Sequence, residues 1–277
     1  MVSASPFSLE GRTVLLTGAA GFLGRRMAEA LLCHGARLLA LGRAERLEGL
    51  GEAWAQTFGS DRVRVARVDM YDTAGLRDLL HELVDTEASI DVLVNNAHEL
   101  GPASGFNVSE GSLESSTLEQ WDRNLSGGIR WPLLTTQAVG PVMKRQRRGS
   151  IVNIATMYAA VAPSPRLYDG TDLGNPPGYS AAKAGMVAFT RYVASYWGPF
   201  GVRANAILPG PFSNTEDVSP NAVRPDDPFL ERLASRTCLG RIGTAGELAG
   251  PLVFLASDAS SYVTGHALVV DGGWTTI

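Results

Sequence analysis

The chain has 277 residues, 45% of them hydrophobic, which is enough to bury the core of one large domain or of two small ones. Its formal net charge of -4 gives no basic surface excess, which argues against nucleic acid as the main partner. We find no signal peptide and no apolar run of the roughly 18 residues that a membrane span needs, so the chain is expected to be cytoplasmic.

Strands and helices are predicted to alternate along the chain, because short aliphatic runs are separated by longer amphipathic segments. The expected strands are residues 12–16, 36–41, 62–68, 91–95, 150–154, 202–207 and 267–270. The expected helices are residues 21–34, 44–58, 73–87, 118–147, 178–197 and 245–257. This alternation is typical of βαβ units. We therefore predict one α/β domain over residues 1–277, with a Rossmann-type, doubly wound parallel sheet and a short flexible N-terminus over about residues 1–8.

Three long segments interrupt the alternation, and each follows the end of a predicted strand. They are residues 98–116, 157–177 and 209–237. Ligands of open α/β sheets bind outside the carboxyl ends of the strands, and long loops in compact domains are usually functional or disordered. We therefore place the substrate side here, with residues 209–237 as the expected substrate loop.

A glycine-rich turn, residues 17–24, lies between the first predicted strand and the first predicted helix. Gly18, Gly21 and Gly24 would let the backbone turn tightly and approach a pyrophosphate, whose charge the amides of a helix N-terminus stabilise. A glycine triplet also occurs in ordinary tight turns. The strand–turn–helix setting favours dinucleotide binding.

The end of the second predicted strand indicates which dinucleotide is bound. An Asp there would hydrogen-bond the ribose 2′-hydroxyl of NAD, whereas this chain has Arg43. A guanidinium suits a 2′-phosphate, so we favour NADP, with NAD as the second choice. Alternatively, Arg43 only begins a solvated helix. Asp69, after the third strand, would bind the adenine amino group or cap the next helix.

Tyr179 and Lys183 are four residues apart in a predicted helix, so their side chains lie on one face. An ammonium beside a phenol favours the phenolate, and we expect Lys183 to lower the pKa of Tyr179 toward neutrality. Such a phenol can exchange protons with an alcohol or a ketone near neutral pH. The spacing alone is a weak signal, because a solvated or interfacial contact would look the same.

Five motifs in order make the chain resemble the short-chain dehydrogenase/reductase family, in its compact single-domain branch. They are the glycine turn, Asn95-Asn96-Ala97, Tyr179 with Lys183, the segment NAILPG at 205–210 and the tail GHALVVDGG at 265–273. The resemblance runs from about residue 9 to residue 273. It implies that Tyr179 is the catalytic acid/base and that Lys183 binds the nicotinamide ribose. It also implies that Thr156 orients the substrate oxygen, where the family usually has Ser.

The resemblance further implies an NAD(P)-dependent oxidoreductase that moves a hydride between nicotinamide and an alcohol or ketone, and a homo-oligomer, either a dimer or a homotetramer. The predicted catalytic residues are Tyr179, Lys183 and Thr156. The predicted cofactor-binding residues are Gly18, Ala20, Gly21, Phe22, Leu23, Arg43, Asp69, Met70, Asn96, Ala97, Tyr179, Lys183, Pro209 and Gly210. No metal is expected, because the four histidines are scattered.

The chain departs from the family pattern around the catalytic helix. An ungapped match places Gly128 where the family has an asparagine that holds a water for proton relay. Asn124, one helical turn earlier, would replace it or would be an ordinary surface amide, and we favour the surface amide. Phe22 and His98 stand where the branch usually has Gly, and the spacing of Gly18, Gly21 and Gly24 instead resembles that of the family's extended, sugar-nucleotide-modifying branch.

The segment between Thr156 and Tyr179 is longer than is usual in the branch, with residues 163–177 as the surplus. Its polar residues would hydrogen-bond a polyhydroxylated or sugar-like substrate, or the segment would be a subunit contact or surface loop. They are Arg166, Tyr168, Asp169, Thr171 and Asp172. Two other functions stay open: a redox-neutral epimerase or dehydratase that retains its cofactor, and a nucleotide-sensing protein that has lost catalysis.

Overall fold

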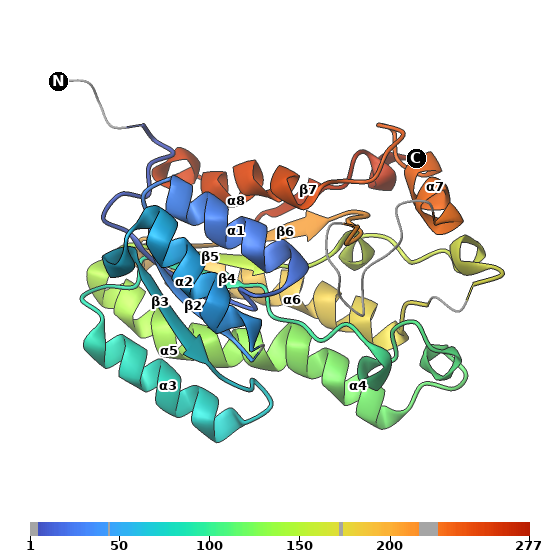
Figure 1. Ribbon diagram of the computed structural model, residues 1–277, viewed down its shortest axis with the longest axis horizontal. Coiled ribbons are helices and arrows are strands. Elements are labelled where there is room, and N and C mark those ends of the chain that lie inside the picture. The colour runs from blue at the N-terminus through green and yellow to red at the C-terminus, as the bar shows by residue number, and fades with distance from the viewer. Residues whose placement is uncertain (1–4, 44, 172–173, 216–226) are drawn as a thin grey trace.

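The computed structural model describes residues 5–43, 45–171, 174–215 and 227–277. They form a seven-stranded sheet in which every pairing is parallel, with the order β3-β2-β1-β4-β5-β6-β7 (Figure 1). The strands are β1 (Thr13–Thr17), β2 (Arg37–Gly42), β3 (Val63–Arg67), β4 (Val92–Asn95), β5 (Gly149–Ile154), β6 (Val202–Pro209) and β7 (Ala267–Val270). The predicted Rossmann-type parallel sheet is confirmed.

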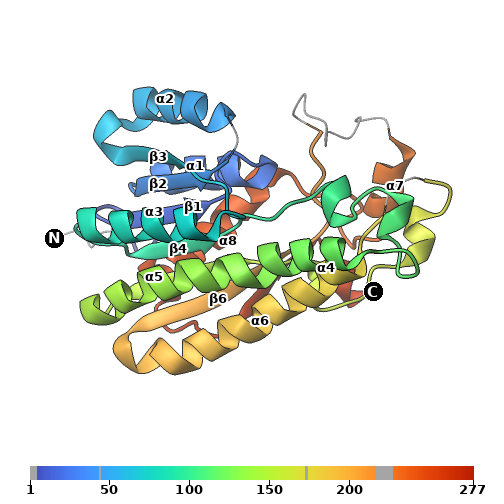
Figure 2. The same ribbon diagram turned by 90° about the horizontal axis from the view of Figure 1, so that it is seen from below.

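Helices cover both faces of this sheet. They are α1 (Phe22–Cys33), α2 (Arg46–Phe58), α3 (Thr73–Thr86), α4 (Leu118–Leu125), α5 (Trp131–Gln146), α6 (Pro177–Trp197), α7 (Pro228–Ser235) and α8 (Ala249–Ala256). Helices α1, α2 and α8 pack into one hydrophobic core, whereas α3, α5 and α6 pack into another on the opposite face (Figures 1 and 2). Within the described ranges, no helix combines the length and the apolar composition needed to cross a membrane.

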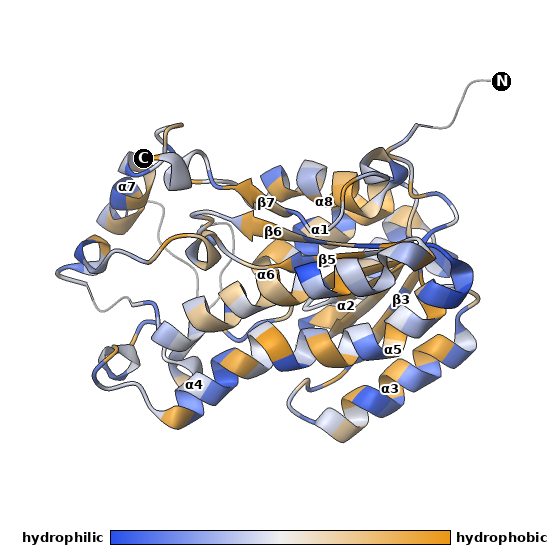
Figure 3. Cartoon of the chain, turned by 180° about the vertical axis from the view of Figure 1, so that it is seen from behind, coloured by the Kyte–Doolittle hydropathy of each residue, from blue (hydrophilic) through white to orange (hydrophobic). Residues whose placement is uncertain are grey.

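The alternation of side chains along the strands creates the two cores. In β1, Val14 and Leu16 belong to the core beneath α1, while Leu15 belongs to the core beneath α3. All three side chains are completely buried. Because both faces of the sheet are covered, its central strands are largely hydrophobic, whereas α3 carries hydrophilic residues on its outer side (Figure 3).

Two predicted helices are less regular than expected, and part of the predicted flexible N-terminus is described. The chain is helical from residue 118 to residue 146, close to the predicted helix 118–147, but a π-helical turn, Ser126–Arg130, separates α4 from α5. This turn contains two consecutive glycines, and glycine weakens a regular helix. The predicted helix 245–257 begins as a 3-10 turn before α8. At the N-terminus, residues 1–4 lie outside the described residues, while the carbonyl of Pro6 accepts a hydrogen bond from the Ala259 amide.

The predicted loop 209–237 contains a helix that the sequence interpretation missed. Helix α7 begins after Asp227, whose carboxylate accepts a hydrogen bond from the amide of Phe229 at 2.8 Å. Asp followed by Pro228 is a helix-start signal, so the helix was detectable from the sequence. Residues 216–226 of the loop lie outside the described residues.

The carboxyl ends of the strands meet at one edge of the sheet, where α4, α7 and the long loops gather (Figures 1 and 2). The chain proceeds outward from β1 to β3 and then returns to β4 on the other side of β1. At such a reversal, the loops that follow neighbouring strands diverge and leave a crevice. The fold therefore predicts the ligand site at the ends of β1 and β4.

Candidate functional site

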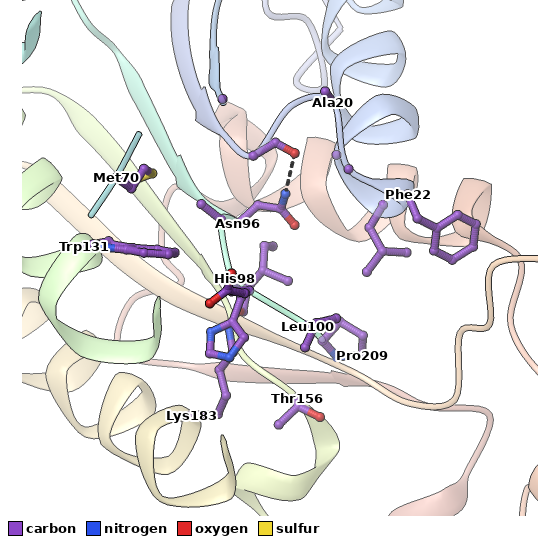
Figure 4. Close-up of a pocket in the computed structure, with 18 of the residues that line it drawn as sticks. Ala20, Phe22, Met70, Asn96, His98, Leu100, Trp131, Thr156, Lys183 and Pro209 are labelled. Carbon is purple, nitrogen blue, oxygen red and sulfur yellow. Dashed lines mark hydrogen bonds between the residues drawn. The ribbon is translucent and has the colours of Figure 1, made fainter. Parts of the chain in front are cut away.

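A cavity of about 370 Å³ opens at the reversal point between β1 and β4 (Figure 4). Every residue predicted to bind the cofactor or to act in catalysis lines this one cavity. They are Gly18, Ala20, Gly21, Phe22, Leu23, Arg43, Asp69, Met70, Asn96, Ala97, Thr156, Tyr179, Lys183, Pro209 and Gly210. The fold thus brings together residues that the sequence distributes over most of the chain.

The turn between β1 and α1 has glycine where the backbone must be approached closely. Gly18 has a φ of 68°, in the left-handed region, and a Cβ there would lie 2.9 Å from the Cα of Ala97. A Cβ on Gly24 would collide with the carbonyl oxygen of Gly18. Asn96 fixes the turn to β4, because its Nδ2 donates to the carbonyl oxygen of Gly18 at 3.1 Å (Figure 4) and to that of Thr17 at 3.2 Å. Side chains at either glycine would therefore disrupt the turn.

The first turn of α1 has no side-chain cap, because its N-cap residue is Gly21. Its amides are free of a competing side chain and are available to an anion. A dinucleotide pyrophosphate carries the charge that such a helix end stabilises, so this turn fits a dinucleotide cofactor. Within the described part of the chain, His, Cys, Asp and Glu side chains form no group suited to a metal ion.

Arg43, directly after β2, is paired with Glu99, which follows β4. Its Nη2 atom lies 3.1 Å from Oε1 of Glu99. The other carboxylate oxygen of Glu99 accepts hydrogen bonds from the Tyr71 hydroxyl at 2.6 Å and from Arg123 Nη1 at 3.0 Å. Arg43 is not the start of helix α2, which begins three residues later. Glu99 was not among the predicted site residues, although it lines the same cavity.

Asp69 lines the cavity and is exposed. Its carboxylate accepts a hydrogen bond from the amide of Tyr71 at 3.0 Å. The cap of α3 is a different residue, Asp72, whose carboxylate accepts from the Gly75 amide at 3.0 Å. The capping alternative for Asp69 is therefore wrong, and its place in the cavity leaves the adenine amino group as the remaining hypothesis.

Tyr179 and Lys183 occupy successive turns of α6. The ring of Tyr179 makes edge contacts with the rings of His98 and Phe106, at centroid distances of 5.0 and 4.9 Å. Lys183 is buried, and its Nζ lies 5.9 Å from the centre of the Tyr179 ring. The same Nζ donates a hydrogen bond to the carbonyl oxygen of Ile154 at 2.7 Å. The ammonium is thus anchored to the end of β5, beside the phenol.

Burial dominates the proton affinities of this pair. It raises the pKa of Tyr179 to about 12, against a hydrogen bond with Thr156 that lowers it. It also lowers the pKa of Lys183 to about 7. The expectation that Lys183 moves the pKa of Tyr179 toward neutrality is therefore wrong for this arrangement. A lysine that has lost its proton before Tyr179 titrates supplies no charge to stabilise the phenolate.

Asn124 does not lie on the surface, contrary to the expectation from the sequence. It is completely buried, and its Nδ2 donates to the carbonyl oxygens of Ser104 and Gln120, each at 2.8 Å. Its Oδ1 lies 3.4 Å from Nε2 of His98. The sequence could not reveal this link, because residues 98 and 124 come from different elements.

His98 also lies at the site. Its only signal in the sequence was that it stands where the family usually has Gly. It lies beside Lys183 (Figure 4). Its ring contacts that of Tyr179. Burial, followed by the charge of Lys183, lowers the pKa of His98 to about 3, so the imidazole is neutral at neutral pH. Space for this ring depends on Gly127, where a Cβ would collide with Nδ1 of His98.

Gly128 has no room for the asparagine that the family carries there. A Cβ at this position would lie 2.6 Å from the Cβ of Ala182 in α6 and 3.0 Å from its carbonyl carbon. We expect Gly128→Asn to lower the free energy of unfolding by about 1–3 kcal/mol, because overpacking forces the backbone to shift. Urea denaturation would measure the change.

Gly250→Asn is the matched control for this substitution, because Gly250 lies in α8 with open space around its Cβ. It should change the free energy of unfolding by less than about 1 kcal/mol. Equal losses in the two variants would mean that helix propensity, and not the contact with Ala182, decides the outcome.

The surplus segment 163–177 and helix α7 lie against each other next to Tyr179. The hydroxyl of Tyr168 is 3.2 Å from that of Tyr158, and its ring centroid is 5.5 Å from that of Phe229 in α7. Arg232 of α7 donates from Nη1 to the carbonyl oxygen of Asp169 at 2.7 Å. Tyr158, Tyr168 and Phe229 share a hydrophobic cluster with Tyr179. Of the polar residues predicted here, Asp172 lies outside the described residues.

Known proteins resemble the chain over nearly its whole length. Residues 18–275 match the family described as Enoyl-(Acyl carrier protein) reductase. The chain is 35% identical to the L-rhamnose 1-dehydrogenase (NAD(P)(+)) of Azotobacter vinelandii, over 95% of this chain and 96% of that one. It is 32% identical to the 2-dehydro-3-deoxy-D-gluconate 5-dehydrogenase of Bacillus subtilis, over 97% and 96% of the two chains. A crystal structure of a gluconate 5-dehydrogenase from Burkholderia cenocepacia J2315, in complex with NADP and tartrate, has a TM-score of 0.79 at 27% identity and covers 98% of each chain.

Proposed function

This chain belongs to the short-chain dehydrogenase/reductase family, and we propose that it is an NAD(P)-dependent dehydrogenase that interconverts the alcohol and ketone forms of a sugar-like substrate. One observation carries the proposal: Tyr179, Lys183 and Thr156 line the same cavity as the glycine turn. A group that can transfer a proton therefore lies beside a backbone cradle that suits a dinucleotide. The relatives reported above are named dehydrogenases, which favours net oxidation or reduction over the redox-neutral alternative.

The protein's own part in the reaction is to position the substrate and to move one proton. When bound, the nicotinamide cofactor would supply the hydride chemistry. During reduction, the hydroxyl of Tyr179 would give its proton to the ketone oxygen and become a phenolate; during oxidation, that phenolate would take the proton of the alcohol. The hydroxyl of Thr156 would hold the same oxygen. Because the pKa of Tyr179 is raised to about 12, the residue keeps its proton at neutral pH. Lys183, anchored at Ile154, would hold the nicotinamide ribose beside Tyr179.

We propose that Arg43 binds the 2′-phosphate of NADP. Arg43→Gln is expected to raise the Kd for NADP⁺ by about tenfold or more, because a guanidinium–phosphate pair forms charge-assisted hydrogen bonds. The Kd for NAD⁺ should stay within about twofold, since NAD has no 2′-phosphate. Isothermal titration calorimetry would measure both constants.

Arg77→Gln is the control for the Arg43 prediction. Arg77 is an exposed residue of α3 outside the cavity, so the substitution removes the same charge without touching the site. It should change neither Kd. If Arg43→Gln weakened NAD⁺ and NADP⁺ equally, Arg43 would not be a phosphate ligand.

We propose that the substrate is polyhydroxylated and lies between Thr156, the described residues of the segment 163–177 and helix α7. The hydroxyls of Tyr158 and Tyr168 and the names of the relatives support this assignment. A panel of aldoses, polyols, aldonates and simple alcohols, followed by nicotinamide absorbance, tests it. Turnover of aldonates or sugars and little turnover of simple alcohols is expected. Conversion of a sugar without net absorbance change would favour an epimerase, and cofactor binding without any turnover would favour a nucleotide sensor.

We also propose that the protein acts in the cytoplasm as a homo-oligomer assembled through α5 and α6. Tyr192 and Tyr196 on α6 stack at a centroid distance of 5.8 Å and are 64% and 61% exposed. Leu133 on α5 is 37% exposed. Large apolar side chains that gather on one face are typical of an interface. Light scattering should give a dimer or tetramer, and Tyr192→Arg should reduce its mass; a parent protein that is monomeric at micromolar concentration contradicts the proposal.

A further inference from the structure

We propose that Glu99 sets the preference of this protein between NADP and NAD by competing with the 2′-phosphate for the guanidinium of Arg43. The inference rests on the proposed cofactor binding and adds a residue that weakens the binding of NADP. Arg43 follows β2 and Glu99 follows β4, and these strands are separated in the sheet by β1. Their contact at 3.1 Å therefore passes across the end of β1, where the glycine turn lies.

Glu99 carries its negative charge at neutral pH. Burial raises its pKa, but hydrogen bonds from Tyr71, Arg123 and Arg43 together bring it below the ordinary value. The Tyr71 hydroxyl and Arg123 both approach the oxygen Oε2, and Arg43 approaches Oε1. A permanent anion is thus held beside the one guanidinium that is proposed to receive the phosphate.

The side chains of Arg43 and Glu99 differ in how firmly their surroundings hold them. The side chain of Arg43 is 59% exposed, whereas that of Glu99 is 14% exposed. Exposed ion pairs contribute little to stability, so Arg43 can change partner easily. Glu99 would then stay where it is, because Tyr71 and Arg123 still hold it, and Arg123 is itself held by Glu119 at 3.2 Å.

The two cofactors respond differently to this arrangement. A 2′-phosphate that binds Arg43 must displace the carboxylate and remain near it, so two anions share one guanidinium and repel each other. The neutral 2′-hydroxyl of NAD meets no such repulsion, and a carboxylate is a good acceptor for a hydroxyl proton. Glu99 therefore weakens the binding of NADP relative to that of NAD. It allows the protein to bind either cofactor although Arg43 follows β2.

Glu99→Gln tests the inference, because the amide keeps the shape and an acceptor oxygen for Tyr71 and Arg123 while it removes the charge. We expect the ratio of Kd for NADP⁺ to Kd for NAD⁺ to fall about threefold to tenfold, measured by calorimetry without substrate. Glu119→Gln is the matched control. It removes the same charge from the other partner of Arg123, at a side chain that is 76% exposed, and should leave the ratio unchanged.

Arg123→Gln should shift the ratio in the opposite direction, toward weaker NADP⁺, because Glu99 then loses the partner that neutralises it when Arg43 leaves. General disturbance of the site would move the Glu99 and Arg123 variants in the same direction. That outcome, or a ratio that Glu99→Gln leaves unchanged, overturns the inference while cofactor binding stands. If the parent protein binds neither cofactor, the proposed function fails together with it.

Discussion

Tyr179→Phe is expected to lower kcat by about 10²–10⁴-fold, because the variant loses the hydroxyl that would exchange a proton with the substrate oxygen. The contacts of the ring with His98 and Phe106 do not involve this hydroxyl, so the fold should be unchanged. The Kd for the cofactor should change by less than about fivefold, as expected when only a hydrogen bond is lost. Steady-state kinetics on the best substrate of the panel and calorimetry on the same preparation would measure both effects.

Tyr158→Phe is the matched control for Tyr179→Phe. Tyr158 is a buried tyrosine of the same region whose hydroxyl contacts that of Tyr168 at 3.2 Å. Its removal should lower kcat by less than about tenfold, because the lost interaction is one neutral hydrogen bond. Near-normal turnover of the Tyr179 variant would contradict the assigned acid/base role, and so would equal losses in the two variants.

Lys183→Met is expected to abolish turnover and yet to stabilise the fold. Lys183 is only 2% exposed, and its ammonium donates a hydrogen bond to the Ile154 carbonyl, with no carboxylate beside it among the described residues. Burial therefore opposes its charge, which is why its pKa is lowered to about 7. Replacing a buried charge by an apolar side chain of similar length should raise the free energy of unfolding by about 1–4 kcal/mol near pH 6. If Lys183 binds the nicotinamide ribose as proposed, function requires at this site a residue that stability alone would not select.

The gain in stability from Lys183→Met should decrease as the pH rises. The pKa of Lys183 is about 7 in the folded state and about 10.4 in an unfolded chain, so between these values the unfolded state binds more protons. The parent protein therefore gains stability from this residue as pH rises from about 7 to about 10, and the advantage of the variant shrinks over the same range. Urea denaturation of both proteins at pH 6, 8 and 10 would measure it.

Lys144→Met is the control for this stability prediction, since Lys144 is the other lysine of the chain and is exposed near the end of α5. Its ammonium lies 4.2 Å from the centre of the Phe200 ring, a contact that contributes about 0.5–1 kcal/mol at exposed sites. The control should be slightly less stable than the parent at pH 6. A Lys183 variant that is less stable than the parent at pH 6 would contradict the argument from burial.

Much of the fold and of the cavity could be predicted because the relevant signals are local. The period of the hydrophobic residues distinguishes strands from helices, and in a parallel sheet the ends of successive strands must meet at one edge. Residues directly after those ends, such as Gly18, Asn96 and Thr156, therefore had to come together whatever the details of packing. The missed helix α7 also has a local signal, since Asp227 followed by Pro228 is typical of a helix start.

Contacts between elements could not be predicted in this way. The sequence suggested that Arg43 faces a phosphate, but its pairing with Glu99 depends on how close β2 and β4 lie across β1. Asn124 looked like a surface amide, whereas its contacts with the Ser104 carbonyl and with His98 bury it against segments that are distant in the sequence. Sequence spacing says nothing about such distances.

By itself, the sequence determined the parallel α/β architecture, the glycine turn and the helical spacing that puts Tyr179 and Lys183 on one face of α6. Only the tertiary structure decided the proton affinities of that pair. A pKa depends on burial and on every neighbouring charge, and both are set by the packing of distant segments. Burial outweighs the attraction that the spacing suggested, so Tyr179 keeps its proton and Lys183 binds its proton weakly.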